Sequence, residues 1–146
     1  MAKRIQINVL EPKAFEGMFA LEKYLEASSL QASHKHLVKI RASQINGCAF
    51  CINMHSVAAI QQGANPYQLL QLDAWPESPA FTSEERLILQ LTEDITRTCD
   101  LSEKTYQAAL SAFGETYLAQ LIMVATNINA WNRIAKSTRM PFELGK

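Results

Sequence analysis

Glycine and proline, at five residues each in 146, place the strongest limit on how this chain can fold. They mostly separate segments that carry apolar residues at helical spacing, as Ala14, Met18, Leu21 and Leu25 do. That spacing puts apolar side chains on one face of a helix. A weak alternation over 5–9 is the one hint of a strand. The pattern predicts an all-α protein, a bundle of six or seven helices.

Capping residues set the expected helix ends. Asn46 and Gly47 are suited to end one helix and turn the chain. Thr82 and Glu85 have the spacing of a capping box, and Ser102 is a further N-cap candidate. No repeat or linker divides the chain, which predicts a single domain over residues 1–146. One helix is expected to start near residue 12 and another at 82. The other expected helices span about 33–45, about 48 to before 63, 66–72, 102 to about 114, and about 115–136.

Charge and hydropathy narrow the expected partners and compartment. Fourteen basic and fourteen acidic side chains balance, which gives no reason to expect nucleic acid or an anionic membrane as partner. The N-terminal residues lack the apolar stretch of a signal peptide, and the longest apolar run, Leu121 to Ala125, is too short to cross a bilayer. We therefore expect a soluble, cytoplasmic protein. The last helix is apolar on most sides, and burial in a subunit interface would cover it more readily than a central position alone.

Two of the three cysteines and one of the three histidines lie together, at Cys48, Cys51 and His55. In a helix these positions share one face. The first turn of a helix offers unpaired N–H groups and the positive end of the helix dipole, which favour a thiolate. His55, one turn beyond Cys51, can accept the thiol proton or stabilise the thiolate charge. The spacing also allows the two sulfurs to form a disulfide, and a disulfide in so short a loop is typically labile and catalytic.

This dithiol predicts a redox centre, in which Cys51 attacks an oxidant to give a sulfenic acid and Cys48 then condenses with it. Inert core packing of the cysteines is one alternative. Zinc binding is another, although the chain has no second C-x-x-C or H-x-x-x-H. The motif would supply three zinc ligands, and a fourth would come from His34, His36 or Cys99. We expect Cys99 to be an unpaired thiol.

The segment Leu37–His55, with its S-Q-x-N-G-C-x-x-C-x-x-x-H core, closely resembles the carboxymuconolactone decarboxylase superfamily, in its AhpD-like alkylhydroperoxidase branch. Trp75, the stretch 82–86 and Asn127–Arg133 extend the resemblance over most of the chain. The resemblance implies an all-helical fold that assembles as a trimer or hexamer. It also implies a peroxidase without haem, flavin or metal, acting on a small hydroperoxide and reduced by a lipoyl-bearing or thioredoxin-like dithiol protein. Asn132, a polar residue on an apolar helix, is expected to make a buried hydrogen bond.

By the family pattern, Cys51 matches the peroxidatic cysteine, Cys48 the resolving cysteine and His55 the histidine of the proton relay. The family's relay glutamate, twelve residues before the first cysteine, is His36 here, and a neutral imidazole can also accept a proton. Phe50 stands where the best-known peroxidases have a histidine. The resemblance predicts a thiol-dependent hydroperoxide reductase. A metal-binding or redox-sensing module without turnover, and a disulfide oxidoreductase acting on protein thiols, are the alternatives.

Overall fold

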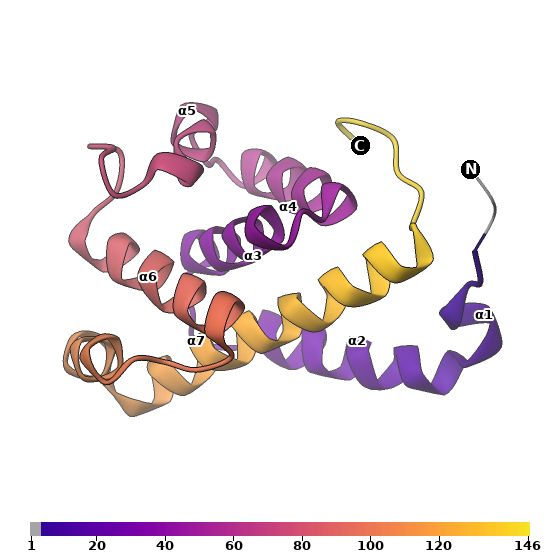
Figure 1. Ribbon diagram of the computed structural model, residues 1–146, viewed down its shortest axis with the longest axis horizontal. Coiled ribbons are helices and arrows are strands. Elements are labelled where there is room, and N and C mark those ends of the chain that lie inside the picture. The colour runs from indigo at the N-terminus through magenta and orange to yellow at the C-terminus, as the bar shows by residue number, and fades with distance from the viewer. Residues whose placement is uncertain (1–3) are drawn as a thin grey trace.

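The computed structural model describes residues 4–146, and helices account for its regular structure (Figure 1). No strand occurs within these residues, so the all-α prediction is confirmed. The hint of a strand at 5–9 is wrong, because a lone strand would find no partner for its backbone groups, whereas a short helix satisfies them locally. The elements are α1 (Ile7–Leu10), α2 (Pro12–Glu26), α3 (Ala32–Asn46), α4 (Ala49–Gln61), α5 (Pro66–Leu70), the 3-10 turn η1 (Leu72–Ala74), α6 (Ser83–Thr98) and α7 (Glu103–Thr138).

Local capping sets the helix ends, as the sequence predicts. Gly47 ends α3 in the left-handed conformation, with φ 63°, and its N–H donates to the carbonyls of Ser43 and Gln44. Thr82 and Glu85 form the expected capping box at the start of α6, and the Ser102 side chain caps α7. The helix expected to reach residue 72 ends earlier, at Leu70, and continues as η1.

A single residue divides α7 into the two helices that the sequence predicts. Gly114 has φ 76° and ψ 169°, values outside the helical region. By length and composition α7 is the one described helix that could cross a bilayer, which is only a weak indication of a membrane. Its second half instead packs against α2, α3, α4 and α6, running between α2 and the α3–α4 pair (Figure 1). We therefore assign it to the core of the bundle, where Leu121, Val124 and Ile128 are buried.

Polar side chains join α3 to its neighbours. Asn132 of α7 is 1% exposed; it donates to Ser43 Oγ (3.0 Å) and accepts from Asn46 Nδ2 (2.8 Å). The expected buried hydrogen bond of Asn132 is thereby confirmed. On another side of α3, Arg41 forms ion pairs with Asp73 (2.7 Å) and Glu93 (2.8 Å). These contacts fix the orientation of α3, the helix that leads directly into the cysteine motif.

Candidate active site

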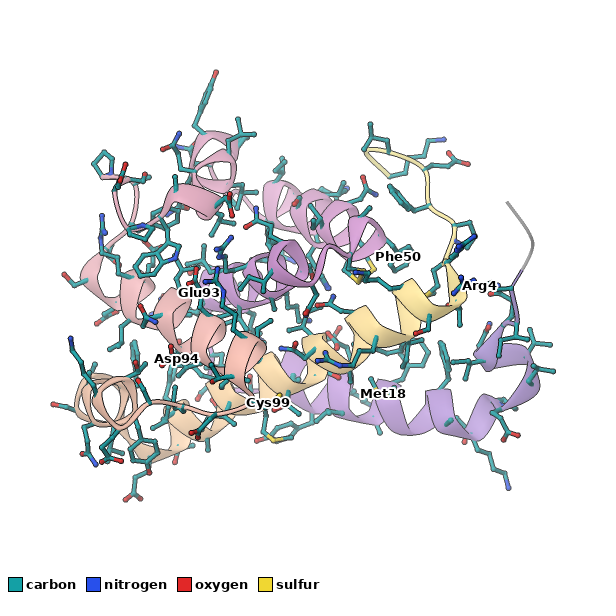
Figure 2. The ribbon with its side chains drawn as sticks, in the orientation of Figure 1. Arg4, Met18, Phe50, Glu93, Asp94 and Cys99 are labelled. Carbon is teal, nitrogen blue, oxygen red and sulfur yellow. A yellow bond between two sulfur atoms is a disulfide. The ribbon has the colours of Figure 1, made fainter. Side chains whose placement is uncertain are left out.

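The two cysteines of the motif are joined at the N-terminus of α4. The left-handed turn at Gly47 ends α3 and leaves Cys48 as the N-cap of α4, with its N–H bonded to Ser43 O (2.9 Å). The Cys51 N–H points at Cys48 Sγ (3.4 Å), and the two sulfurs form a disulfide across Cα atoms 5.4 Å apart. Figure 2 shows this disulfide beside Phe50. The predicted approach of the two sulfurs at the start of a helix is confirmed.

A cavity of about 680 Å³ opens beside the disulfide, between α2, α3, α4 and the end of α7. Cys51, His55 and His36 all line it, whereas Cys48 does not. Both cysteines are only 1% exposed. A cavity of this size suits a small molecule with a largely apolar body. Most of its wall is apolar, from Phe15, Phe19, Phe50, Met54, Trp131 and Met140.

His55 is neutral in this disulfide form of the protein. Its side chain is buried, with the residue 9% exposed, and its pKa is lowered to about 3. Burial is the largest cause, the Lys39 ammonium and the His36 ring act in the same direction, and the Glu22 carboxylate opposes them. An imidazolium at this position therefore requires an additional negative charge, which a Cys51 thiolate would supply.

Glu22 and Lys39 are cavity residues that the sequence reasoning missed. Lys39 forms an ion pair with Glu22 Oε1, and Asn127 donates a hydrogen bond to Glu22 Oε2. Burial alone would raise the pKa of Glu22, but Lys39, Asn127 and the nearby His55 together lower it, so the carboxylate is ionised at neutral pH. Glu22 lies one helical turn after Met18, inside the apolar stripe of α2. The sequence signal that could have identified Glu22 is a carboxylate inside an apolar stripe.

His36, predicted as a substitute for the family's relay glutamate, lies in the cavity wall. Its Nε2 contacts Gln62 Oε1 at 3.0 Å, whereas its Nδ1 is buried without a hydrogen-bond partner. The structure therefore places His36 with Cys51 and His55, and its role in proton transfer stays a prediction.

Of the three residues proposed to complete a zinc site, His34 and Cys99 lie away from the motif, and His36 alone lines the cavity with Cys51 and His55. His34 is buried against Tyr117, with Nδ1 2.7 Å from the hydroxyl, and burial lowers its pKa. Cys99 is an exposed free thiol at the end of α6, as expected. In the part of the chain that the structure describes, no three His, Cys, Asp or Glu side chains are grouped so as to hold a metal ion. The geometry favours the redox interpretation over the zinc interpretation.

Comparison with known proteins agrees with the fold and the motif. The family model of the carboxymuconolactone decarboxylase family matches residues 12–94, more than half of the chain. The chain belongs to this family. The uncharacterized protein YdfG of Bacillus subtilis is similar to this chain, with 34% identity over 137 residues, which is 92% of this chain and 93% of YdfG.

Solved structures place this carboxymuconolactone decarboxylase family member in the AhpD-like branch of the fold. The protein ATU0492 of Agrobacterium tumefaciens, of unknown function and with a suggested AhpD-type role in antioxidant defence, superimposes with a TM-score of 0.93. It is 31% identical, over 98% of this chain and 99% of its own. An uncharacterized peroxidase-related protein of Silicibacter sp. TM1040 has a TM-score of 0.80 at 21% identity, over 90% of this chain and 71% of its own, and shows the shared fold alone.

Proposed function

We propose that the protein is a thiol-dependent hydroperoxide reductase acting on small organic hydroperoxides. One observation carries the proposal: Cys51 is disulfide-bonded to Cys48 at a helix tip and lines, with His55, a cavity of small-molecule size. A dithiol that opens to a small-molecule cavity is suited to oxidation by a small oxidant. The apolar wall favours a hydroperoxide with an apolar alkyl or aryl body over hydrogen peroxide.

The reaction starts from the Cys51 thiolate. Its sulfur attacks the terminal oxygen of the hydroperoxide, so that an S–O bond forms and the O–O bond breaks. The alkoxide leaves with the electron pair and takes up a proton to become an alcohol. The Cys48 thiol then attacks the sulfenic sulfur of Cys51, forming the disulfide, and the hydroxyl group leaves with the Cys48 proton as water.

His55 supplies the proton for the alkoxide. In the reduced protein, the Cys51 thiol proton moves to His55, and the thiolate and imidazolium stabilise each other. Oxidation of Cys51 removes the negative charge, and in the disulfide form the pKa of His55 is about 3. The imidazolium is therefore unstable as soon as the sulfur has reacted, and its proton passes to the leaving alkoxide.

Glu22 takes the place of the carboxylate that the family pattern assigns to the position of His36. Its negative charge favours the imidazolium form of His55, and Lys39 and Asn127 hold it in place. Lys39 has the opposite effect on His55 and prevents it from keeping the proton. Because Glu22 and Lys39 act on His55 in opposite directions, the charge of His55 depends on whether Cys51 is a thiolate.

Two further parts of the proposal concern partners. A dithiol protein, thioredoxin-like or lipoyl-bearing, reduces the disulfide after each turnover. The chain works as a homotrimer or homohexamer; its exposed apolar side chains, among them Val9, Leu10, Leu70 and Met123, are available for subunit contacts.

The test is consumption of cumene hydroperoxide with dithiothreitol as the reductant. Cys51→Ser should abolish turnover. In a single-turnover reaction without dithiothreitol, Cys48→Ser should undergo one rapid oxidation of Cys51, detected as a sulfenic acid by a dimedone probe, and form no intramolecular disulfide. Full turnover by Cys51→Ser would refute the assignment. Turnover of insulin disulfides with no peroxide consumption would instead support the protein disulfide oxidoreductase.

A further inference from the structure

The last residues of the chain form a strap across the start of α4. This strap, residues 140–146, turns back from the end of α7 toward α4 (Figure 1). It begins at Met140, whose N–H bonds to Ala135 O (3.0 Å) and whose side chain lines the cavity. From residue 141 onward its residues are exposed and without regular secondary structure.

Asn53 and Phe50, both on α4, hold the strap. The Asn53 amide donates to the Glu143 carbonyl (3.1 Å) and to a main-chain oxygen of Lys146 (2.9 Å), and it accepts from the Gly145 N–H (2.8 Å). The ring of Phe142 meets the edge of the Phe50 ring, with centroids 6.3 Å apart and planes at 81°. Asn53 thus recognises main-chain groups of a turn, in which Gly145 has φ 78° and the Lys146 N–H bonds to Glu143 O, and a turn in another peptide carries the same groups.

A reductant protein faces an access problem in this structure. A protein thiolate must reach a sulfur of the disulfide, yet both cysteines are 1% exposed. The cavity that leads to Cys51 admits a small molecule and is too small for a loop of a folded protein. Its other walls come from the helices α2, α3, α4 and α7, whereas the strap beyond Met140 is exposed and without regular secondary structure, and is the wall most easily displaced.

We propose that the strap occupies the docking site of the protein reductant, and that a turn of a thioredoxin-like dithiol protein replaces it on Phe50 and Asn53. This inference rests on the proposed function, because it concerns regeneration of the same disulfide. The incoming main chain restores the three hydrogen bonds that the buried Asn53 amide would otherwise lose.

Displacement of the strap opens the side of the cavity at Met140 and Phe50, next to Cys51. The first partner thiolate attacks Cys51 Sγ, forming a mixed disulfide and releasing Cys48 as a thiolate that takes up a proton. The second partner thiol then attacks the partner's sulfur in the mixed disulfide and releases Cys51 as a thiolate. The partner leaves as a disulfide, having transferred two electrons.

The test measures reduction of the disulfide form by Escherichia coli thioredoxin and, separately, by dithiothreitol, with new thiols counted by alkylation and mass spectrometry. Phe142→Ala removes an aromatic contact of the strap and should speed reduction by thioredoxin about tenfold. Asn53→Ala frees the strap but also removes the docking contacts, so it should not speed reduction by thioredoxin. Leu144→Ala, at a side chain 88% exposed, is the matched control and should behave as the unmodified protein.

Dithiothreitol enters through the cavity, so its rate should stay within about twofold in all three variants. Three outcomes overturn the proposal. In the first, Phe142→Ala does not change the rate of reduction by thioredoxin. That result would mean that the reductant enters through the cavity, as a lipoyl arm would. Equal acceleration of both reductants means simple uncovering of the disulfide, and acceleration by Asn53→Ala means a lid without a docking role. The assay contains no peroxide, so its outcome is independent of whether the protein is a peroxidase.

Discussion

Helix α3 buries two cations in two different polar environments. Lys39 and Arg41 are two residues apart, which places their side chains ~200° apart around the helix axis. Arg41 faces α6 and η1, whereas Lys39 faces α2 and the cavity. Both side chains are well buried, at 4% and 12% exposure.

The environment of Arg41 is fully paired. Its guanidinium donates to Glu93 (2.9 Å from Nε), Asp73 and Gln44. Glu93, which is labelled in Figure 2, also accepts from Trp75 Nε1 (2.8 Å). Each donor has an acceptor and each charge an opposite charge. Such a network orients helices and has no spare capacity for chemistry.

The environment of Lys39 is incompletely paired. Among the described residues, the two buried side-chain nitrogen or oxygen atoms without a partner are His36 Nδ1 and Asn127 Oδ1. His36 lines the cavity and Asn127 holds Glu22, and the displaced pKa of His55 belongs to the same region. Buried groups in unfavourable states concentrate where a protein performs its function. The comparison therefore separates a structural polar network from a reactive one on the two sides of one helix.

Substitution of Arg41 should have the largest effect, on stability alone. Arg41→Met leaves Glu93, at 14% side-chain exposure, as a buried carboxylate without its main partner. We expect the free energy of unfolding to fall by about 3–5 kcal/mol, measured by urea denaturation. Peroxide consumption per folded molecule should not change.

A matched control uses the other cation near Glu93. Arg97 lies 3.6 Å from Glu93 Oε2 but is 55% exposed, so Arg97→Met should lower stability by less than about 1 kcal/mol. Loss of peroxide turnover in folded Arg41→Met would show that the two environments are coupled.

Acidification should destabilise the disulfide form through His55. Between pH 6.5 and pH 3 the unfolded chain binds a proton at this imidazole, whereas the folded protein, with a pKa of about 3, excludes it. Stability therefore decreases as pH falls, by about 3 kcal/mol between pH 6.5 and pH 4. Glu22, with its lowered pKa, stabilises the fold above about pH 4.5 and adds to the loss below that value.

The variant His55→Gln isolates this contribution. His34 also has a lowered pKa and remains in both proteins, so the difference between their urea-unfolding curves reports on His55 and its interaction with Glu22. The variant should lose less stability than the unmodified disulfide protein as pH falls to 4. Parallel curves for the two proteins would mean that His55 is protonated in the fold and would remove the basis of its proposed role.

Glu22 and Lys39 should shift the pKa of His55 in opposite directions. Lys39→Met removes a repelling cation, so the pKa of His55 should rise. Glu22→Gln should lower it. The measurement is an NMR titration of the His55 ring in the disulfide form. In Lys39→Met, protonation of the ring should begin before acid unfolds the protein. In Glu22→Gln, the folded protein should show no protonation of the ring. Shifts of the same sign would contradict the assignment.

Sequence reasoning was sufficient for features that depend on near neighbours. The turn at Gly47 and the caps at Thr82 and Ser102 follow from bonds within a few residues. The Cys48–Cys51 disulfide closes across one helical turn. Such contacts can be predicted because the chain has little choice in making them.

The features that could not be predicted from the sequence depend on tertiary packing. Glu22 reaches the cavity only because α2 packs beside α3 and α7, where Asn127 lies 105 residues further along the chain. His34, a candidate metal ligand, is directed away by Tyr117, 83 residues distant. The strap bonds to Asn53 across 90 to 93 residues. No spacing rule within a single sequence specifies such pairs.

The smallest expected effect concerns Cys99, which belongs to neither environment of α3. It ends α6 in the left-handed conformation, with φ 58°, where a side chain with a Cβ is strained. Cys99→Gly should raise the free energy of unfolding by about 0.5–1 kcal/mol, because glycine adopts this conformation without strain. The greater entropy of glycine in the unfolded chain offsets part of this gain. Cys99→Ser keeps the Cβ and should gain nothing. Peroxide turnover should be unchanged in both variants, and a loss in both would mean that a third thiol takes part in the redox cycle.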